Sequence, residues 1–434
     1  MEMSTREAAL CALERSRRDG AWSDAVLDSI IRRAGLDKRD AALTSRLCYG
    51  VQQNQSLCDF YINAYSSTRT ARMEPKVLDI LRLSVYAILF LDRIPIRATI
   101  FEAVELCKKN GVSRASGLVN AVLRRIAENR DSLPEIPGKG TAEYLSTLYS
   151  HPLWLVKSFV DRLGYDACEA LLKANNDTPG IWAQVNTLKT DMDALMKDGA
   201  EMHPWLPDCI LLPEGADGMR AVYEGLAYVQ DPAARIAVLA AAPKPGMSVL
   251  DACAAPGGKS FASAMLMKDK GSILSCDMHD KKLGRLRTQA QRLGVGCIET
   301  RAMDARKAAS LGMVFDLVLA DVPCSGLGVI RKKPDIRYKD EKELAGLPEI
   351  QLDILRGVSK CVKTGGVLLY STCTLMEAEN EAVCTQFLRE NQDFSTDSFE
   401  LPGPIGKVES GMLTMWPHIH DTDGFFVCKM RRSI

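Results

Sequence analysis

The chain has 434 residues, of which 47% are hydrophobic and 25% are charged, and its 55 Lys and Arg balance its 55 Asp and Glu. This length predicts two or three domains, and this composition excludes a largely disordered protein. The balanced charge also excludes an electrostatic attraction of the whole molecule to nucleic acid, so only local patches can provide one. Since no apolar run approaches 18 residues, we expect no membrane span.

The cysteines and histidines set further limits. Fourteen cysteines follow an N-terminus without signal-peptide character, which indicates reduced thiols and a cytoplasmic protein. No Cys-x-x-Cys pair occurs, and the five histidines are scattered except for His418 and His420. We therefore expect no metal site.

Residues 1–132 are predicted to form a helical domain. Apolar residues recur there at spacings of three and four, as in 77–91 and 115–126, with turn residues between the helices. The region is mildly basic, and its arginines could contact phosphates or simply belong to a solvated helical surface. The arginines considered are Arg69, Arg72, Arg124 and Arg125.

The rest of the chain changes character twice. A Pro- and Gly-rich linker at 133–140 leads to a predicted small α+β connecting domain at 141–235. From 236 to 434, short apolar runs alternate with amphipathic segments, which predicts an α/β domain with a doubly wound, mostly parallel sheet. Its predicted strands are 248–251, 272–277, 298–302, 315–320, 367–370 and 424–430, and its predicted helices are 259–267, 281–293, 348–362 and 377–391.

The first strand of this α/β domain leads into a loop of small residues, Asp251-Ala-Cys-Ala-Ala-Pro-Gly-Gly-Lys259. Gly257 and Gly258 would let the backbone approach a ligand closely, and the helix start that follows favours a polar or anionic group. The loop is not a P-loop, because Cys253 stands where that motif has glycine, and the dinucleotide fingerprint is absent. A structural turn without a ligand is the alternative.

Acidic residues mark the ends of the next strands. Asp277, about twenty residues beyond the glycines, could accept hydrogen bonds from ribose hydroxyls. Asp304 follows the third strand and could face an adenine edge. Either acid alone is more often a turn or helix cap. Together with Asp251, however, they place three acids at consecutive strand ends, which favours a nucleoside cofactor, and S-adenosylmethionine suits the pattern better than NAD.

Two cysteines follow later strands, Cys324 in Asp321-Val-Pro-Cys-Ser-Gly and Cys373 in Ser371-Thr-Cys-Thr. Open α/β sheets bind substrates at such strand ends. A thiolate that adds to C6 of cytosine makes C5 reactive enough to be methylated, and a second group must then assist loss of the C5 proton and release of the thiol. Lys259 is a cation that could lower a thiol pKa. Any single buried cysteine, by contrast, is more often inert.

A basic loop, 329–339, lies between the two cysteine motifs. Basic side chains around a tyrosine suit phosphate contact and base stacking in single-stranded RNA, and a solvated loop is the alternative. The predicted RNA-binding residues are Arg331, Lys332, Lys333, Arg337 and Tyr338.

Over nearly its whole length the chain resembles the Sun (Nop/Sun) family of RNA cytosine-5 methyltransferases. The matching motifs are Asp251-Ala-Cys-Ala-Ala-Pro-Gly-Gly-Lys, Asp321-Val-Pro-Cys, Arg331-Lys-Lys-Pro-Asp-Ile, Ser371-Thr-Cys-Thr followed by Glu377 and Asn380, and Asp423-Gly-Phe-Phe. The helical region resembles a NusB-like RNA-binding domain in Ile94-Pro, Glu102-Ala-Val-Glu and Leu118-Val-Asn-Ala-Val-Leu-Arg. This pairing implies a Rossmann-like class I methyltransferase that uses S-adenosyl-L-methionine to methylate a cytosine at C5 in 16S (small-subunit) rRNA.

The resemblance also implies roles for individual residues. Cys373 would be the nucleophile and Cys324 would assist product release, while Asp321 and Lys259 would hold the base and polarise the site. The cofactor pocket would be lined by Cys253, Ala254, Ala255, Pro256, Gly257, Gly258, Lys259, Asp277, Asp304 and Asp321.

The chain departs from the family pattern at a few positions. Lys282 stands where an arginine is usual, His279 where an acid is common, and 324–328 reads Cys-Ser-Gly-Leu-Gly instead of Cys-Ser-Ala-Thr-Gly. The first two changes concern ribose-side contacts more than the identity of the cofactor, and the third is mild. We expect a monomer. The alternatives are a tRNA-directed cytosine-5 methyltransferase of the same family and a non-catalytic NusB-like RNA-binding protein.

Overall fold

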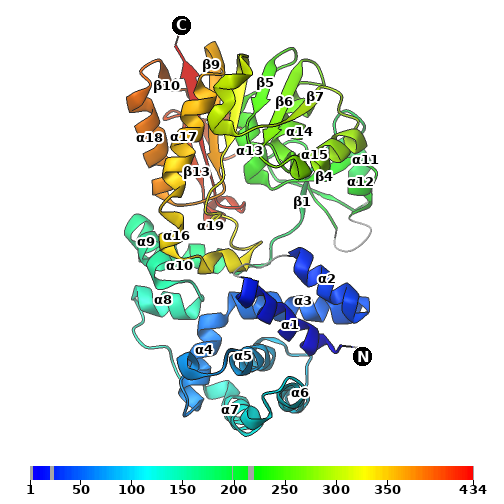
Figure 1. Ribbon diagram of the computed structural model, residues 1–434, viewed down its shortest axis with the longest axis vertical. Coiled ribbons are helices and arrows are strands. Elements are labelled where there is room, and N and C mark those ends of the chain that lie inside the picture. Colours follow the sequence, from blue (N-terminus) through cyan, green and yellow to red (C-terminus); the bar gives the residue numbers. More distant parts are fainter. Residues whose placement is uncertain (1–2, 20–23, 198, 214–218, 434) are drawn as a thin grey trace. The chain divides into compact units, whose positions relative to one another are not determined.

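The computed structural model describes residues 3–19, 24–197, 199–213 and 219–433. The chain divides into two compact units, one made of 1–176 with 333–339 and the other of 177–332 with 340–434 (Figure 1). Within the described ranges, no helix is both long enough and apolar enough to cross a bilayer.

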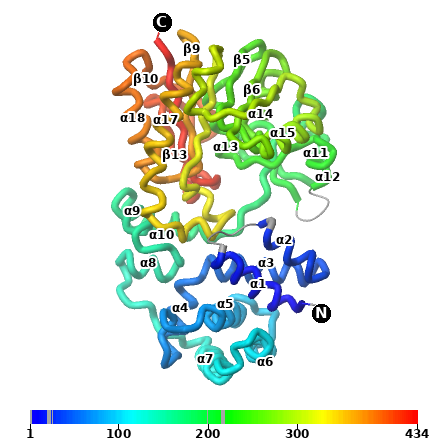
Figure 2. Tube along the Cα trace, in the orientation of Figure 1, coloured from blue at the N-terminus to red at the C-terminus, as the bar shows by residue number. Residues whose placement is uncertain are grey.

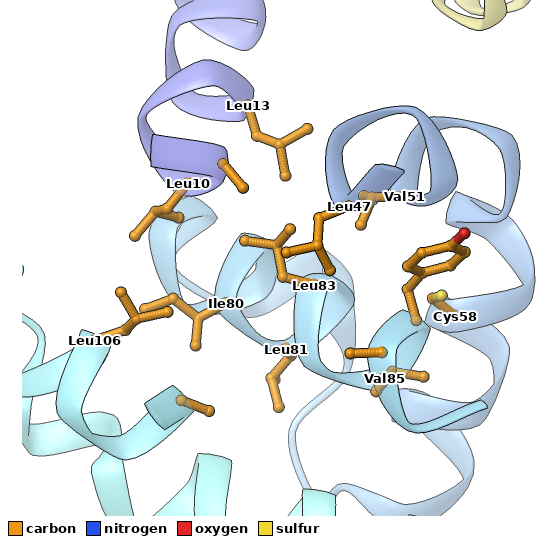
Figure 3. Close-up of a cluster of buried hydrophobic side chains, with 14 of the residues drawn as sticks. Leu10, Leu13, Leu47, Val51, Cys58, Ile80, Leu81, Leu83, Val85 and Leu106 are labelled. Atoms are coloured by element: carbon orange, nitrogen blue, oxygen red, sulfur yellow. The ribbon is translucent and has the colours of Figure 1, made fainter. Parts of the chain in front are cut away.

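The first unit is helical, as predicted for its N-terminal part. Its helices are α1 (Thr5–Asp19), α2 (Asp24–Ala34), α3 (Lys38–Gln53), α4 (Gln55–Tyr65), α5 (Pro75–Phe90), α6 (Ile96–Lys109), α7 (Ser116–Glu128), α8 (Ala142–Leu148), α9 (Leu153–Leu163) and α10 (Tyr165–Ala174), with 3-10 turns η1 (Thr70–Arg72), η2 (Ser113–Ala115) and η3 (Arg130–Ser132). Apolar side chains of α1, α3, α5 and α6 meet in one core (Figure 3). Helix α5 is central to this core, since Ile80, Leu81 and Leu83 are almost fully buried.

A short segment from later in the sequence, 333–339, also belongs to the first unit, and its path can be followed in Figure 2. It contains the 3-10 helix η5 (Pro334–Tyr338), whose Arg337 is fully buried. The Arg337 guanidinium donates hydrogen bonds of 2.8–3.5 Å to the backbone oxygens of Gln53, Tyr149, Ser150 and Asn175 and to Oδ1 of Asn176. The Tyr338 hydroxyl donates to the backbone oxygen of Gln52 at 2.7 Å.

These contacts correct the prediction that Arg337 and Tyr338 bind RNA. The guanidinium is enclosed by acceptors of its own unit, and the tyrosine hydroxyl is bound to backbone, so both side chains fix the segment. Buried polar groups are normally satisfied in this way. Lys333, at the start of the same segment, is exposed.

The second unit begins with a small antiparallel sheet in the order β2-β3-β1-β4, made of β1 (Trp182–Val185), β2 (Glu201–Met202), β3 (Cys209–Leu211) and β4 (Ala227–Val229), with helices α11 (Met192–Met196) and α12 (Arg220–Tyr223). The segment predicted as a connecting domain therefore contributes α8–α10 to the first unit and these strands to the second.

The main sheet has the order β10-β14-β9-β8-β5-β6-β7, with β13 paired to β14. Its strands are β5 (Ser248–Asp251), β6 (Ser272–Asp277), β7 (Ile298–Ala302), β8 (Phe315–Asp321), β9 (Val362–Thr372), β10 (Phe394–Thr396), β13 (Met412–Met415) and β14 (Phe425–Arg432). The strands from β5 to β9 are parallel, and β14 pairs antiparallel with β9. A separate hairpin consists of β11 (Phe399–Leu401) and β12 (Gly406–Val408).

Helices cover both faces of the main sheet (Figure 1). They are α13 (Pro232–Ala241), α14 (Gly258–Leu266), α15 (Asp280–Leu293), α17 (Leu347–Ser359) and α18 (Glu381–Glu390). The second unit also contains the short helices α16 (Glu341–Leu344) and α19 (Pro417–His420) and the 3-10 turns η4 (Ala305–Leu311) and η6 (Glu377–Glu379). Successive strand residues point to opposite faces. Val249 thus packs with α13–α15, whereas Leu250 packs with α17 and α18. This confirms the predicted doubly wound α/β fold.

Candidate active site

The loop and acids predicted to bind a cofactor meet at one edge of the main sheet. Strands β8, β5, β6 and β7 are adjacent and parallel, so their carboxyl ends share that edge. The loop 253–259 follows β5, and Gly257 has φ +118°, a conformation that favours glycine. A Cβ at Gly257 would also lie 2.9 Å from Cγ of Leu286, so the close packing of the loop on α15 requires glycine.

Asp251, at the end of β5, is buried beside this loop. Its Oδ2 accepts a 2.7 Å hydrogen bond from Ser260, whose hydroxyl also lies 2.7 Å from that of Ser275. Burial raises the pKa of Asp251 to about 7. Its Oδ1 has no hydrogen-bond partner among the described residues. The carboxyl group thus has one acceptor atom left for a ligand donor.

The other two predicted cofactor acids differ in their pairing. Asp277, nearly buried at the end of β6, accepts a 2.9 Å hydrogen bond from the backbone N–H of His279 through Oδ1. Asp304 caps η4 and binds Arg306 through both oxygens, at 2.8 and 3.0 Å. The Arg306 hydrogen bond lowers the pKa of Asp304. Both acids lie at strand ends as predicted, but Asp304 is already occupied by an arginine.

Lys259 and Asp321 form an ion pair at the centre of this edge. Lys259 Nζ lies 2.7 Å from Oδ2 of Asp321, and Ser371 donates a 2.8 Å hydrogen bond to Oδ1 of the same carboxylate. The lysine also lies over the ring of Phe425, 4.8 Å from its centroid, a cation–π distance. Sequence reasoning missed Ser371 and Phe425 as site residues. For Phe425 the missing information was that β14 pairs with β9.

Cys324 and Cys373 lie together beyond the adjacent strands β8 and β9. Their Sγ atoms are 3.3 Å apart, and both residues are half-buried. The hydrogen bond between the sulfurs lowers the pKa of Cys373, and Lys259 acts in the same direction. The same hydrogen bond, with burial, raises the pKa of Cys324 well above that of an ordinary thiol. The thiol of Cys373 therefore ionises more readily than that of Cys324.

Close backbone packing holds the region around Cys373 in place. The N–H of Gly328 donates to the backbone oxygen of Cys373 at 2.9 Å, and the N–H of Gly424 donates to Gly328 at 2.7 Å. A Cβ at Gly328 would overlap the backbone of Gly424 and lie 2.8 Å from the oxygen of Cys373. Only glycine therefore allows this approach of three chain segments.

Arg331 and Lys332, two of the predicted RNA-binding residues, are engaged in ion pairs inside the second unit. Lys332 Nζ lies 2.5 Å from Asp231 and 2.7 Å from Asp423, and Arg331 pairs with Asp421 at 3.1 Å. Arg331 is also buried. Their charges tie the loop to the start of α13 and to the segment before β14, so a phosphate contact would compete with these carboxylates.

A doubly wound sheet whose first strand leads into such a small-residue loop, with acids at the next strand ends, is the fold of a class I methyltransferase. The family model described as 16S rRNA methyltransferase RsmB/F matches residues 238–431. The NusB family model matches 3–128, and the ferredoxin-like domain of RsmF/B-like methyltransferases matches 151–217.

Full-length relatives agree with these domain matches. The chain is 39% identical to probable ribosomal RNA small subunit methyltransferase B of Bacillus subtilis, with 99% of each chain covered. It is 32% identical to the protein of the same description from Synechocystis, covering 99% of this chain and 100% of that one. The crystal structure of PH0851 superposes with a TM-score of 0.78 at 27% identity and covers 98% of both chains. The chain belongs to the family of ribosomal RNA small subunit methyltransferase B.

Proposed function

We propose that this protein transfers a methyl group from S-adenosyl-L-methionine to C5 of a cytosine in 16S rRNA, through a covalent bond between Cys373 and C6. The observation that carries the proposal is the pair of sulfurs 3.3 Å apart at adjacent strand ends, beside the Lys259–Asp321 ion pair. Two thiols in one site match a reaction that needs both a nucleophile and a group that assists its release.

The substrate class follows from the relatives and the domain make-up. The relatives carry the description of ribosomal RNA small subunit methyltransferases, and residues 3–128 match the NusB family. We assign RNA binding to the helical domain 1–132, positioning to the connecting domain 141–235, and catalysis to 236–434. Exposed Lys333 is the residue of the 331–338 loop that we retain as an RNA contact. A cytoplasmic monomer suits this role.

The residues of the sheet edge fit S-adenosylmethionine. Asp251 Oδ1 is buried beside the loop 253–259 and has no hydrogen-bond partner within the described part of the chain, so it can accept a hydrogen bond from the ammonium group of the ligand. Asp277 is the residue assigned to the ribose. Asp304, bound by Arg306, would have to share its oxygens to contact the adenine.

When bound, S-adenosylmethionine supplies an electrophilic methyl group. The Cys373 thiolate adds to C6 of the cytosine, and the displaced ring electrons make C5 the carbon that takes the methyl group. A water molecule then takes the C5 proton, and the electrons of the C5–H bond restore the C5–C6 double bond. The bond between C6 and sulfur breaks, and Cys373 leaves as a thiolate. Cys324 assists this release, while Lys259 and Asp321 hold the base.

The direct test is labelled methyl transfer by the full-length protein to purified 16S rRNA and to tRNA, followed by bisulfite mapping. We expect 5-methylcytosine in 16S rRNA and none in tRNA. Transfer to tRNA alone would support the tRNA-directed alternative, and RNA binding without any transfer would support the non-catalytic one. Bisulfite mapping of rRNA from cells that lack the protein should show the same cytosine unmethylated.

A trapping experiment tests the covalent route. In Cys324→Ala, Cys373 can still add to C6 but its release is slowed, so a protein–RNA complex should accumulate and survive a denaturing gel. Cys373→Ala should form no such complex. If the two variants show the opposite behaviour, the assignment of roles to the two cysteines is reversed, although the enzyme class is retained.

A further inference from the structure

A buried carboxylate lies behind the two cysteines, and the mechanism above does not use it. Glu379 is 2% exposed and lies in the turn η6. Its Oε2 accepts hydrogen bonds from the backbone N–H of Ser325 at 2.8 Å and from Nε2 of Gln351 at 2.9 Å. Burying a carboxylate costs free energy unless the group is hydrogen-bonded. These contacts therefore indicate that the carboxylate has a specific structural role.

The partners of Glu379 surround Cys324. Ser325 directly follows this cysteine, and Gln351 also donates a 3.0 Å hydrogen bond to the backbone oxygen of Pro323, which directly precedes it. Because Gln351 is itself bound to Glu379, the residues on both sides of Cys324 are fixed by one connected pair of side chains. Movement of this carboxylate would therefore move the Cys324 sulfur.

The next residue, Asn380, fixes the other cysteine in the same manner. Its Oδ1 accepts a 2.6 Å hydrogen bond from the hydroxyl of Thr372, and its Nδ2 donates to the backbone oxygen of Thr374 at 3.0 Å. These two threonines flank Cys373. Two consecutive residues of the chain thus hold the two cysteine segments.

A direct link joins the two cysteine segments as well. The hydroxyls of Ser325 and Thr374 lie 2.7 Å apart, and Thr374 also donates to Oε1 of Glu379 at 3.4 Å. The negative charge of Glu379 is one of the influences that raise the pKa of Cys324. The carboxylate therefore acts on the placement of both thiols and on the protonation of one.

We propose that Glu379 is a positioning residue that sets the separation of the Cys324 and Cys373 sulfurs and so controls release of the methylated base from Cys373. The inference rests on the proposed function. Glutamine at 379 keeps the size of the side chain but has one oxygen where the carboxylate has two. It cannot accept from the Ser325 and Gln351 donors and from the Thr374 hydroxyl at once, so the connection between the two cysteine segments is weakened. Addition of Cys373 to C6 would continue, whereas release would be slowed.

The experiment compares full-length wild type, Glu379→Gln and Glu377→Gln, a matched control because Glu377 is exposed in the same turn. We expect Glu379→Gln to lower kcat about tenfold to a hundredfold, to leave KM for S-adenosylmethionine within about twofold, and to accumulate the complex seen with Cys324→Ala. Wild type and Glu377→Gln should accumulate none. Thermal unfolding checks that each variant is folded.

The outcomes separate the inference from the proposed function. If wild type methylates no RNA, the proposed function fails. If wild type is active but folded Glu379→Gln accumulates no complex, whether its turnover is normal or lost, the positioning role is wrong. Should Glu379→Gln not fold, Thr374→Val is tested instead, because it removes the hydroxyl that joins Glu379 to Ser325. That hydroxyl also accepts a 3.3 Å hydrogen bond from the N–H of Met376. Complex accumulation in that variant supports the inference, and its absence overturns it.

Discussion

Strand β8 carries nearly the same polar arrangement at both of its ends. Near its start, Asp316 lies 2.8 Å from Lys363 Nζ and accepts a 2.8 Å hydrogen bond from the Ser248 hydroxyl. At its end, Asp321 lies 2.7 Å from Lys259 and accepts a 2.8 Å bond from Ser371. The pairing is the same, but the two cysteines and the loop 253–259 lie at the carboxyl end.

The difference between these two ends teaches that an acid–lysine–serine cluster does not by itself indicate a site. The position of the cluster in the sheet determines whether it belongs to a binding site, because open α/β sheets bind ligands beyond the carboxyl ends of their strands. The comparison can be tested by making equivalent changes at the two ends and measuring both methyl transfer and stability.

The largest expected effect is that of removing the nucleophile. Cys373→Ala should lower methyl transfer at least about a thousandfold, because the C6 adduct cannot form without this thiol. Transfer of labelled methyl to 16S rRNA measures it. Cys297→Ala, which alters a cysteine outside the site, should keep normal activity. An active, folded Cys373→Ala would exclude the covalent mechanism.

Equivalent lysine substitutions compare the two ends of β8 directly. Lys259→Met removes the cation that lowers the pKa of Cys373, so we expect about a hundredfold loss of kcat and a higher pH for thiol alkylation at this cysteine. Lys363→Met is the matched control and should change kcat by less than about twofold, because its partner Asp316 lies away from the cysteines. An equal loss of kcat in both variants would show that the two ends of β8 do not differ in their contribution to catalysis.

A third cation, Arg337, extends the comparison to the helical unit. Burial lowers its pKa to about 10, and its partners are backbone oxygens and one amide rather than a carboxylate. Arg337→Met should leave these buried acceptors unpaired and reduce the free energy of unfolding by about 2 kcal/mol. Chemical denaturation measures it. The neighbouring exposed Lys333→Met should stay within about 0.5 kcal/mol of wild type.

Arg337 also shows a limit of prediction from sequence, because its partners lie far away in the chain. The predicted strands 248–251, 272–277 and 298–302 have the bounds of β5, β6 and β7, because each segment is bounded by glycines, acids or turn residues. The short antiparallel strands β10 and β13 were not predicted, since their stability comes from pairing with β14. Local pattern carries no information about such distant partners.

The same limit explains the mixed result for the basic loop. Charge and an aromatic residue at 331–338 suggested RNA contacts, but partners far along the chain engage four of its five candidates. The partners of Lys332 are Asp231 and Asp423, and those of Arg337 lie between residues 53 and 176 apart from the backbone oxygen of Pro334. The loop 253–259 and the two cysteines were located correctly at the sheet edge, because a strand end is a local feature.

The smallest expected effect concerns the amino end of β8. Burial acts to raise the pKa of Asp316, but the hydrogen bonds from Lys363 and Ser248 prevail and lower it to about 2. A lowered folded-state pKa gives stability that is present above the unfolded value of 3.8 and is lost as pH falls toward 2. Asp316→Asn should remove this dependence, so wild type should lose up to about 1 kcal/mol more than the variant between pH 5 and pH 2, the side chain being about one-third exposed. Urea unfolding across that range measures the difference, and parallel curves for the two proteins would show that this cluster, unlike the one at Asp321, contributes no measurable charge pairing.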